Sequence, residues 1–196
     1  MGFSDKPRSR MTNKPAIEQS GDTQMSASME ALYCQYAPQG KRYAFSMLRH
    51  STDAEEVTQE AFCRLLSKSA EWEVDECESR LQNFPALFFT TLRNLCIDLI
   101  RKNQRQRQVS LDATVEPAAK SHSDDSRQLE TQVIAIMNQM PDQWSDALKL
   151  KINGQLSYAE IARVLDVTHA QIRTWIYRAR RHLETELKKA GLNTVG

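Results

Sequence analysis

Apolar residues recur along most of this chain at the three- and four-residue spacing that places side chains on one face of an α-helix. Among 196 residues there are only six glycines and six prolines, too few for the many tight turns of a sandwich or a barrel. A chain of this length can build one or two small cores. We therefore predict an all-α protein of two small helical domains joined by a flexible linker, the second containing a helix-turn-helix.

The first domain is predicted at residues 28–103, after a disordered polar extension at 1–27. Its first helix is expected to break at Pro38–Gly40, because proline interrupts the hydrogen bonding of a helix. Asp53 is predicted as the N-cap of the next helix, with Glu56 three residues later completing a capping box. The apolar stripe of this helix is expected to comprise Val57, Ala61, Phe62, Leu65 and Leu66.

A polar segment at 104–125 is predicted to be the linker, because it lacks an apolar stripe, contains Pro117 and is too long for an ordinary connection. Before it, residues 71–83 show no helical period and are predicted as a loop or a frayed helix. The helix that starts near Phe84 is expected to end in the basic run that begins at Arg101.

The second domain is predicted at residues 126–190, followed by a tail at 191–196. Its first helix is expected to stop at Pro141. A second helix, with Ile152 in its apolar stripe, is expected to end at Asn153–Gly154.

The stretch that follows has the layout of a helix-turn-helix. Ser157 and Glu160 form a predicted capping box for a short helix, Asp166–Val167 a turn, and Thr168 the cap of a long final helix that reaches Leu187. The second helix of such a motif enters the DNA major groove. The plainer alternative is a helical hairpin with a charged surface.

The start of the final helix leaves polar side chains outward. Glutamine can pair with adenine and arginine with guanine, each contact adding roughly 1–3 kcal/mol of discrimination. Trp175 lies beside the apolar stripe and is expected to pack in the core. The residues expected to face DNA are His169, Ala170, Gln171, Arg173, Thr174, Tyr177 and Arg178, with Arg180, Arg181 and Lys188 placed for phosphates.

Charges are segregated although the net charge is only +1. Basic residues gather after Arg93 and again after Arg173, which indicates two contacts with a polyanion. The acidic patch at 53–60 and a second at 71–78 indicate a protein partner of opposite charge. Taken singly, each run is more typical of a solvated helix face, but the segregation of charge into both domains favours the functional interpretation.

The four cysteines form no C-x-x-C pair and have no histidine at ligand spacing, so we expect no metal and no cofactor. Free and mostly buried thiols, with no apolar run that could span a bilayer and no secretion signal, predict a cytoplasmic protein without membrane insertion. A redox role for Cys77 is the alternative. Either Met1 or Met11 is consistent with the start of translation.

Several of these segments resemble the bacterial sigma factors of the extracytoplasmic-function group, the fourth group of the sigma-70 type. Residues 53–62 (DAEEVTQEAF) are similar to the polymerase-binding motif of the family, and Asn94, Asp98 and Arg101 match its minus-ten segment. Residues 140–143, 156–162 and 172–180 are similar to its promoter-reading fourth region. The resemblance covers nearly everything from Leu32 to Leu187.

The resemblance implies a sigma factor that binds core RNA polymerase and promoter DNA and has no catalytic residues of its own. An anti-sigma protein is a candidate further partner. The acidic helix would bind the basic coiled coil of the polymerase through Asp53, Glu55, Glu56, Gln59 and Glu60. Asn94 would line the pocket for a flipped minus-ten base, beside Arg93, Arg101, Lys102 and Arg105. The minus-thirty-five element would be contacted by His169, Gln171, Arg173, Thr174, Tyr177, Arg178 and Arg181.

Three positions depart from the family pattern. The family usually has tryptophan where this chain has Leu87, and commonly arginine where it has Trp175. It has an apolar residue where this chain has Thr58, a small change because the helix is expected to be partly exposed. The second departure removes one expected phosphate contact.

Two other classes of protein fit parts of the sequence. A repressor or activator with a dimerising N-terminal domain would share the helix-turn-helix, but it has no need of the acidic face at 53–62. An enzyme would need a reactive group, and the candidates Cys63, Cys96, His50 and His169 lie in no nucleophile, metal or phosphate-loop motif.

Overall fold

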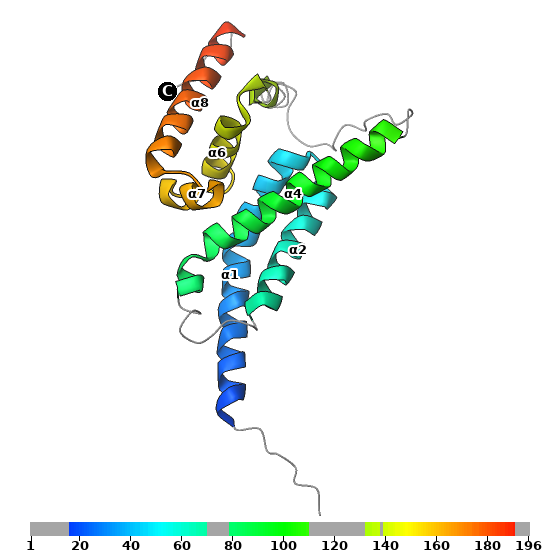
Figure 1. The fold of residues 1–196 in the computed structure, drawn as a ribbon, viewed down its shortest axis with the longest axis vertical. Coiled ribbons are helices and arrows are strands. Elements are labelled where there is room, and N and C mark those ends of the chain that lie inside the picture. Colours follow the sequence, from blue (N-terminus) through cyan, green and yellow to red (C-terminus); the bar gives the residue numbers. More distant parts are fainter. Residues whose placement is uncertain (1–15, 70–78, 110–131, 138, 191–196) are drawn as a thin grey trace, which may run out of the picture.

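The computed structural model describes residues 16–69, 79–109, 132–137 and 139–190, with side chains from Met29 onward and up to Gln106 in the second range. The described elements are all helical (Figure 1). The order is α1 (Ala16–Leu48), α2 (Ser51–Ser69), α4 (Phe84–Val109), α6 (Asp142–Ile152), α7 (Tyr158–Leu165) and α8 (His169–Lys189). Short helical stretches also occur at 79–82 and 132–137. The predicted fold class is confirmed.

The first unit is a three-helix assembly in which α1 and α2 lie side by side and α4 crosses them (Figure 1). Its core is aromatic. The ring of Phe62 on α2 lies 4.4 Å from that of Phe88 on α4, and the Tyr33 ring of α1 packs edge-on against Phe62 at 4.7 Å. Phe84, Phe88 and Phe89 of α4 are fully buried in this core.

The predicted break at Pro38–Gly40 is wrong, because α1 continues through both residues. A Cβ added to Gly40 would lie 2.7 Å from Cζ of Phe88 and 3.3 Å from Cδ2 of Leu92. Glycine therefore serves here as the point where α4 approaches the α1 backbone closely. Packing of this kind outweighs the local tendency of proline to interrupt a helix.

Two predicted domain limits also differ from the structure. α1 begins at Ala16, inside the segment predicted as disordered, and α4 extends to Val109, past the predicted linker start at 104. Once a helix is nucleated by packing, each further residue adds a hydrogen bond at low cost, and glutamine, arginine and lysine are good helix formers. The rest of the predicted extension and linker lies outside the described residues.

α2 begins at Ser51, so Asp53 lies inside its first turn and is not its N-cap. Instead, Nδ1 of His50 accepts a hydrogen bond from the Asp53 backbone N–H at 3.2 Å. Thr58 was expected to be partly exposed but is fully buried, and its hydroxyl donates to the Ala54 carbonyl at 2.6 Å. This bond satisfies the polar group, so threonine replaces an apolar residue at small cost. Leu66, predicted to face inward, is 50% exposed.

In the second unit, local sequence signals set the helix ends as predicted. α7 starts with a capping box between Ser157 and Glu160, and α8 starts with one between Thr168 and Gln171. Asp166 ends α7 in the left-handed conformation, with φ 52°. Ile152 is an exception: it is 54% exposed at the last turn of α6 instead of buried in its stripe.

The two units share one apolar core. α4 packs against α7 and α1 against α6, which places the second unit beside the first across α4 (Figure 1). The main cluster accordingly joins Phe88, Phe89 and Leu92 to Leu150, Ile161 and Ile172. A second cluster around Leu148, Ala179 and Leu187 belongs to the second unit alone.

Candidate polymerase and DNA interfaces

The acidic residues of α2 form the first candidate interface. Glu55, Glu56, Gln59 and Glu60 are exposed, and Asp53 is half-buried. Two of the carboxylates form ion pairs within the chain, since Glu55 pairs with Lys41 and Glu60 lies 2.7 Å from Nε of Arg64. These exposed pairs are weak in water, so the carboxylates can exchange partners with a basic surface.

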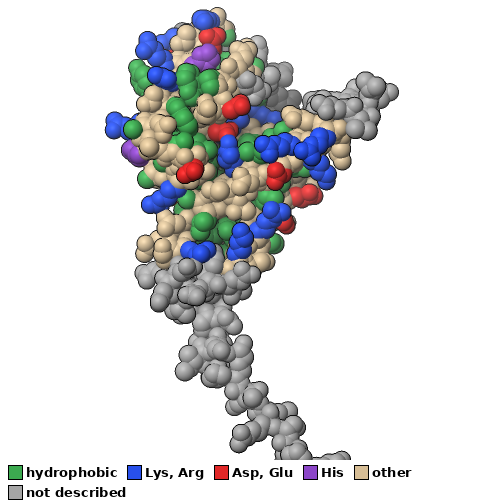
Figure 2. All heavy atoms as spheres, viewed as in Figure 1, with side chains coloured by type: hydrophobic (Ala, Val, Ile, Leu, Met, Phe, Trp, Pro, Cys, Tyr) green, Lys and Arg blue, Asp and Glu red, His purple; other side chains and the backbone are tan. Residues whose placement is uncertain are grey.

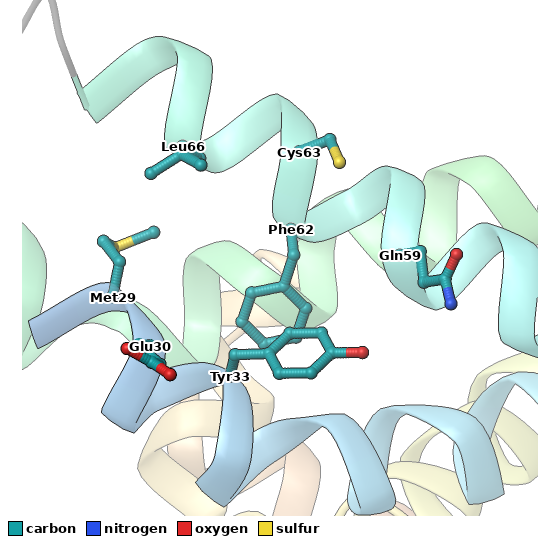
Figure 3. A pocket seen from close by; sticks show the side chains of 7 residues that line it. All are labelled: Met29, Glu30, Tyr33, Gln59, Phe62, Cys63 and Leu66. Atoms are coloured by element: carbon teal, nitrogen blue, oxygen red, sulfur yellow. The ribbon is translucent and has the colours of Figure 1, made fainter. Parts of the chain in front are cut away.

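An apolar groove beside this acidic face was not anticipated from the sequence. It has a volume of about 490 Å³ and lies between α1 and α2, with the rings of Tyr33 and Phe62 at its floor (Figure 3). Gln59 lies at one end, so the groove continues the acidic face into an apolar one. The only hint of this groove in the sequence is Leu66, and its position in the predicted apolar stripe indicates a buried residue instead. The other lining residues are Met29, Glu30, Cys63 and Leu66.

The second candidate interface follows α4. At about 100° per residue, Asn94, Arg101 and Arg105 lie along one stripe of the helix, with Lys102 beside it. All four are exposed. Arg101 lies 4.0 Å from Asp98, one turn earlier, and both side chains are more than half exposed. Figure 2 shows Lys and Arg side chains gathered over the end of α4 that projects from the molecule.

Arg93 does not join the other predicted minus-ten residues. Its guanidinium points to α6, where Oδ2 of Asp146 accepts from Nη2 at 2.7 Å and from Nε at 3.1 Å. The side chains of Arg93 and Asp146 are only 28% and 14% exposed. The structure therefore pairs this arginine with the second unit.

The third candidate interface is the outer face of α8. Arg173, Thr174, Tyr177, Arg178 and Arg181 are all exposed, and Tyr177 is 63% exposed despite its large ring. They lie opposite the buried stripe, which comprises Ile172, Ile176, Ala179 and Leu187. Figure 2 shows basic side chains over α8 as well as over α4. This helix therefore presents the surface that a groove-reading helix needs.

Two of the predicted α8 residues have local roles. Oε1 of Gln171 accepts hydrogen bonds from the backbone N–H and the hydroxyl of Thr168, at 2.9 and 2.8 Å. The His169 ring packs edge-on against Tyr158 of α7 at 5.9 Å. Both remain exposed, but the cap holds the Gln171 carbonyl and leaves its amide NH₂ as the group free to face a base.

Trp175 is partly buried against the core, as predicted. The prediction of mostly buried thiols was wrong for Cys34 and Cys63, which are exposed. Cys96 is buried, and this burial raises the pKa of its thiol to about 12. Such a thiol carries almost no thiolate at neutral pH and is a poor nucleophile.

Within the described ranges, no group of three His, Cys, Asp or Glu side chains could hold a metal ion. In the same part of the chain, no helix has the length and apolar character needed to cross a membrane.

Comparison with known families matches the two units separately. Residues 32–106 match the family model of Sigma-70 region 2, and residues 130–183 match that of Sigma-70, region 4. The first match contains the α2 and α4 interfaces, and the second contains the predicted DNA-facing residues of α8, which lie between His169 and Arg181.

The proteins of similar sequence include three sigma factors. The ECF RNA polymerase sigma factor SigM of Bacillus subtilis is 24% identical over 85% of this chain and 98% of its own length. The ECF RNA polymerase sigma factor SigE of Mycolicibacterium smegmatis is 28% identical over 97% of this chain and 73% of its own length. The ferric citrate uptake sigma factor FecI of Escherichia coli is 22% identical, over 82% of this chain and 91% of FecI.

Among solved structures, the fold is similar to that of the sigma factor RpoE from Bartonella quintana, which was crystallised with the anti-sigma factor NepR. The TM-score is 0.58 at 21% identity, covering 87% of this chain and 98% of the other. At this identity the likeness concerns the fold.

Proposed function

This chain belongs to the extracytoplasmic-function group of the sigma-70 family, and from that premise we propose a specific role for each of its three candidate interfaces. As a sigma factor it is a non-catalytic subunit that directs promoter-specific initiation by RNA polymerase, and its region 2 recognises and melts the minus-ten element. In the proposed assignment, α2 binds core polymerase, α4 captures the melted minus-ten strand, and α8 reads the minus-thirty-five element.

The observation that carries this proposal is the separation of an acidic face from two basic faces on different helices. A protein that only bound DNA would gain nothing from exposed Glu55, Glu56 and Glu60 on α2, because they repel phosphates. Opposite a basic protein surface the same charges favour association. The neighbouring groove adds apolar surface to this contact, with Leu66 and Tyr33 as its proposed contributors.

On α4, Asn94 is proposed to hydrogen-bond a base extruded from the non-template strand. Extrusion costs a few kcal/mol of unstacking, which contacts with the flipped base must offset. Arg101, Lys102 and Arg105 continue along the helix and are placed to hold the adjacent phosphates. Arg93 belongs to the same proposed set.

On α8, Arg173 and Thr174 lie in the first two turns, where a recognition helix contacts base edges. Tyr177, Arg178 and Arg181 are proposed to contact bases or the phosphate backbone further along. His169 and Gln171 complete the proposed set at the start of the helix. Relatives in the family commonly have arginine at the position of Trp175. In this proposal, Arg178 and Arg181 supply the positive charge that contacts the DNA phosphate backbone instead.

The proposal places the protein in the cytoplasm, where RNA polymerase acts. The proposed region 2-like domain spans about residues 28–103 and the proposed region 4-like domain about 126–190. α1 and α4 extend as helices beyond the limits of the first. An anti-sigma protein is a proposed regulator, since such a protein accompanies the structurally similar RpoE.

The test is in vitro transcription with purified core polymerase on a promoter library, with and without this protein. We expect transcripts that start at a shared two-element promoter only when the protein is added. Glu56→Arg should abolish initiation by weakening core binding while leaving DNA binding intact. Asn94→Ala should retain core binding but lose promoter opening, measured by permanganate reactivity of unpaired thymines.

Gln106→Ala is the matched control for Asn94→Ala, because Gln106 is an exposed amide on α4 that lies about 120° around the helix from Asn94. It should initiate like the unchanged protein. No initiation with core polymerase, together with sequence-specific DNA binding by the protein alone, would overturn the proposal in favour of a conventional helix-turn-helix regulator.

A further inference from the structure

The side-chain amide of Gln171, in the first turn of α8, is held through its oxygen alone. Oε1 accepts hydrogen bonds from the backbone N–H of Thr168 at 2.9 Å and from the Thr168 hydroxyl at 2.8 Å. These two bonds use both lone pairs of the amide oxygen. Because a backbone N–H can only donate, the amide atom that faces it must be the oxygen. The NH₂ group is therefore the part of this amide that is left to contact another molecule.

The corresponding cap of α7 is made by a residue without such a donor. There Oε2 of Glu160 accepts from the Ser157 backbone N–H at 2.7 Å, and the Ser157 hydroxyl accepts from the Glu160 N–H at 3.2 Å. A glutamate in the first turn also interacts favourably with the positive end of the helix dipole. Glutamate would therefore cap α8 at least as well as Gln171 does. What glutamine adds is an uncharged donor that the cap itself does not use.

Gln171 lies on the face of α8 that is proposed to contact DNA. Its side chain is exposed, and at about 100° per residue Thr174 and Arg178 follow it on the same side of the helix. The buried stripe, which includes Ile172 and Ile176, lies on another side. Residues in the first turns of a recognition helix contact base edges in the major groove. The donor of Gln171 is therefore placed to meet a base.

The cap decides which base this amide can recognise. An unrestrained glutamine pairs with adenine by donating to N7 and accepting from the N6 amino group, which requires both amide atoms. In the capped side chain the oxygen is occupied, so only donation remains. Guanine presents two acceptors in the major groove, N7 and O6, and no donor. Guanine therefore matches the capped amide, whereas the amino group of adenine would oppose one donor to another.

We infer that Gln171 reads a guanine of the minus-thirty-five element, because the Thr168 cap restricts its side chain to hydrogen-bond donation. This inference rests on the proposed contact of α8 with that element. Gln171 touches the base, and Thr168 is a positioning residue that acts through it. The residue type alone predicts adenine, so the base preference at this position is set by the helix cap.

The test uses holoenzyme assembled from core polymerase and the full-length protein. Initiation is measured on templates in which each base pair of the minus-thirty-five element is changed in turn to the three others. At the position that variants of Gln171 alter, guanine should exceed adenine by about three- to tenfold, the range expected for one hydrogen bond. A preference of the unchanged protein for adenine at that position would overturn the inference.

Gln171→Glu keeps the cap, as Glu160 does in α7, and replaces the donor with an acceptor. A carboxylate accepts from the N4 amino group of cytosine, so the preference at one position should invert from guanine to cytosine. Gln143→Glu is the matched control, because it makes the same charge change at an exposed position of α6. It should invert no preference. If Gln171→Glu lowers initiation equally on all templates, the amide does not contact a base and the inference is wrong.

The positioning role of Thr168 is tested by two substitutions. Thr168→Ala removes one of the two donors that hold Oε1, so the ratio of initiation on guanine to that on adenine should fall at least about twofold. Thr168→Ser keeps the hydroxyl and should keep the ratio. A loss of helix stability alone would lower initiation on both templates and leave their ratio unchanged. An unchanged ratio in Thr168→Ala would therefore overturn the role of the cap.

Failure of the proposed function would give a different result from failure of this inference. If the unchanged protein initiates on no template with core polymerase, the proposed function is wrong, and the inference with it. If it initiates without a guanine preference that depends on Gln171, the proposed function stands and this inference alone is overturned.

Discussion

The two units reach their helical folds by different means. The first is organised by distant contacts, in which rings from α1 and α4 meet the Phe62 ring of α2, and in which α4 approaches the α1 backbone at Gly40. The second is organised by short-range signals, with two capping boxes and one left-handed residue between α7 and α8. Helix ends that depend on neighbours in sequence can be predicted from sequence, whereas those that depend on packing cannot.

This difference predicts that the largest loss of stability comes from the aromatic core. Phe88→Ala should lower the free energy of unfolding by about 3–5 kcal/mol, because it leaves a cavity among Phe62, Phe84 and Phe89. Urea unfolding followed by circular dichroism measures the change. Tyr177→Ala removes an exposed ring from the second unit and should change stability by less than about 0.5 kcal/mol. If Phe88→Ala lowers the free energy of unfolding by less than about 1 kcal/mol, the aromatic contacts are not what stabilises the first unit.

Gly40→Ala tests the close approach itself. In an ordinary helix this change would stabilise by about 0.5–1 kcal/mol, but here the added Cβ would lie 2.7 Å from the Phe88 ring. We therefore expect a destabilisation of about 1–3 kcal/mol. Combining it with Phe88→Leu should cost less than the sum of the single changes, because a smaller side chain makes room. Strict additivity would show that the two residues do not meet.

Ser157→Ala examines a local determinant in the second unit. Loss of the hydroxyl that accepts from the Glu160 N–H should lower the free energy of unfolding by about 1 kcal/mol. Ser157→Asp should keep most of the stability, since aspartate caps equally well. The same thermal or urea unfolding measurement serves both variants, and an equal loss in both would show that capping is not the cause.

Asp166→Gly should have the smallest effect and the opposite sign. Asp166 adopts φ 52° and ψ 52°, a conformation that costs glycine little. We expect a gain of about 0.5 kcal/mol, and a loss for the β-branched Asp166→Val. If glycine also destabilises, the side chain of Asp166 contributes more than its backbone costs.

The part of the candidate interfaces that could be predicted from sequence depends, like the helix ends of the second unit, on patterns within a few residues. Exposure of Arg173, Thr174 and Tyr177 on α8 follows from a helical period that the sequence displays, and the structure places them outward. The pairing of Arg93 with Asp146 joins residues from different units, and no local pattern indicates it. The groove at Leu66 depends likewise on how α1 lies against α2.

The amino-acid sequence alone therefore determined the helical class, the helix-turn-helix and the order of acidic and basic helices, because these depend on spacing and capping within a few residues. Tertiary structure decided that α1 passes through Pro38, that Thr58 is buried, and that Arg93 faces the second unit. Each of these is set by the shape and charge of a partner distant in sequence. Packing energy, summed over many such contacts, exceeds the local preferences that a sequence pattern expresses.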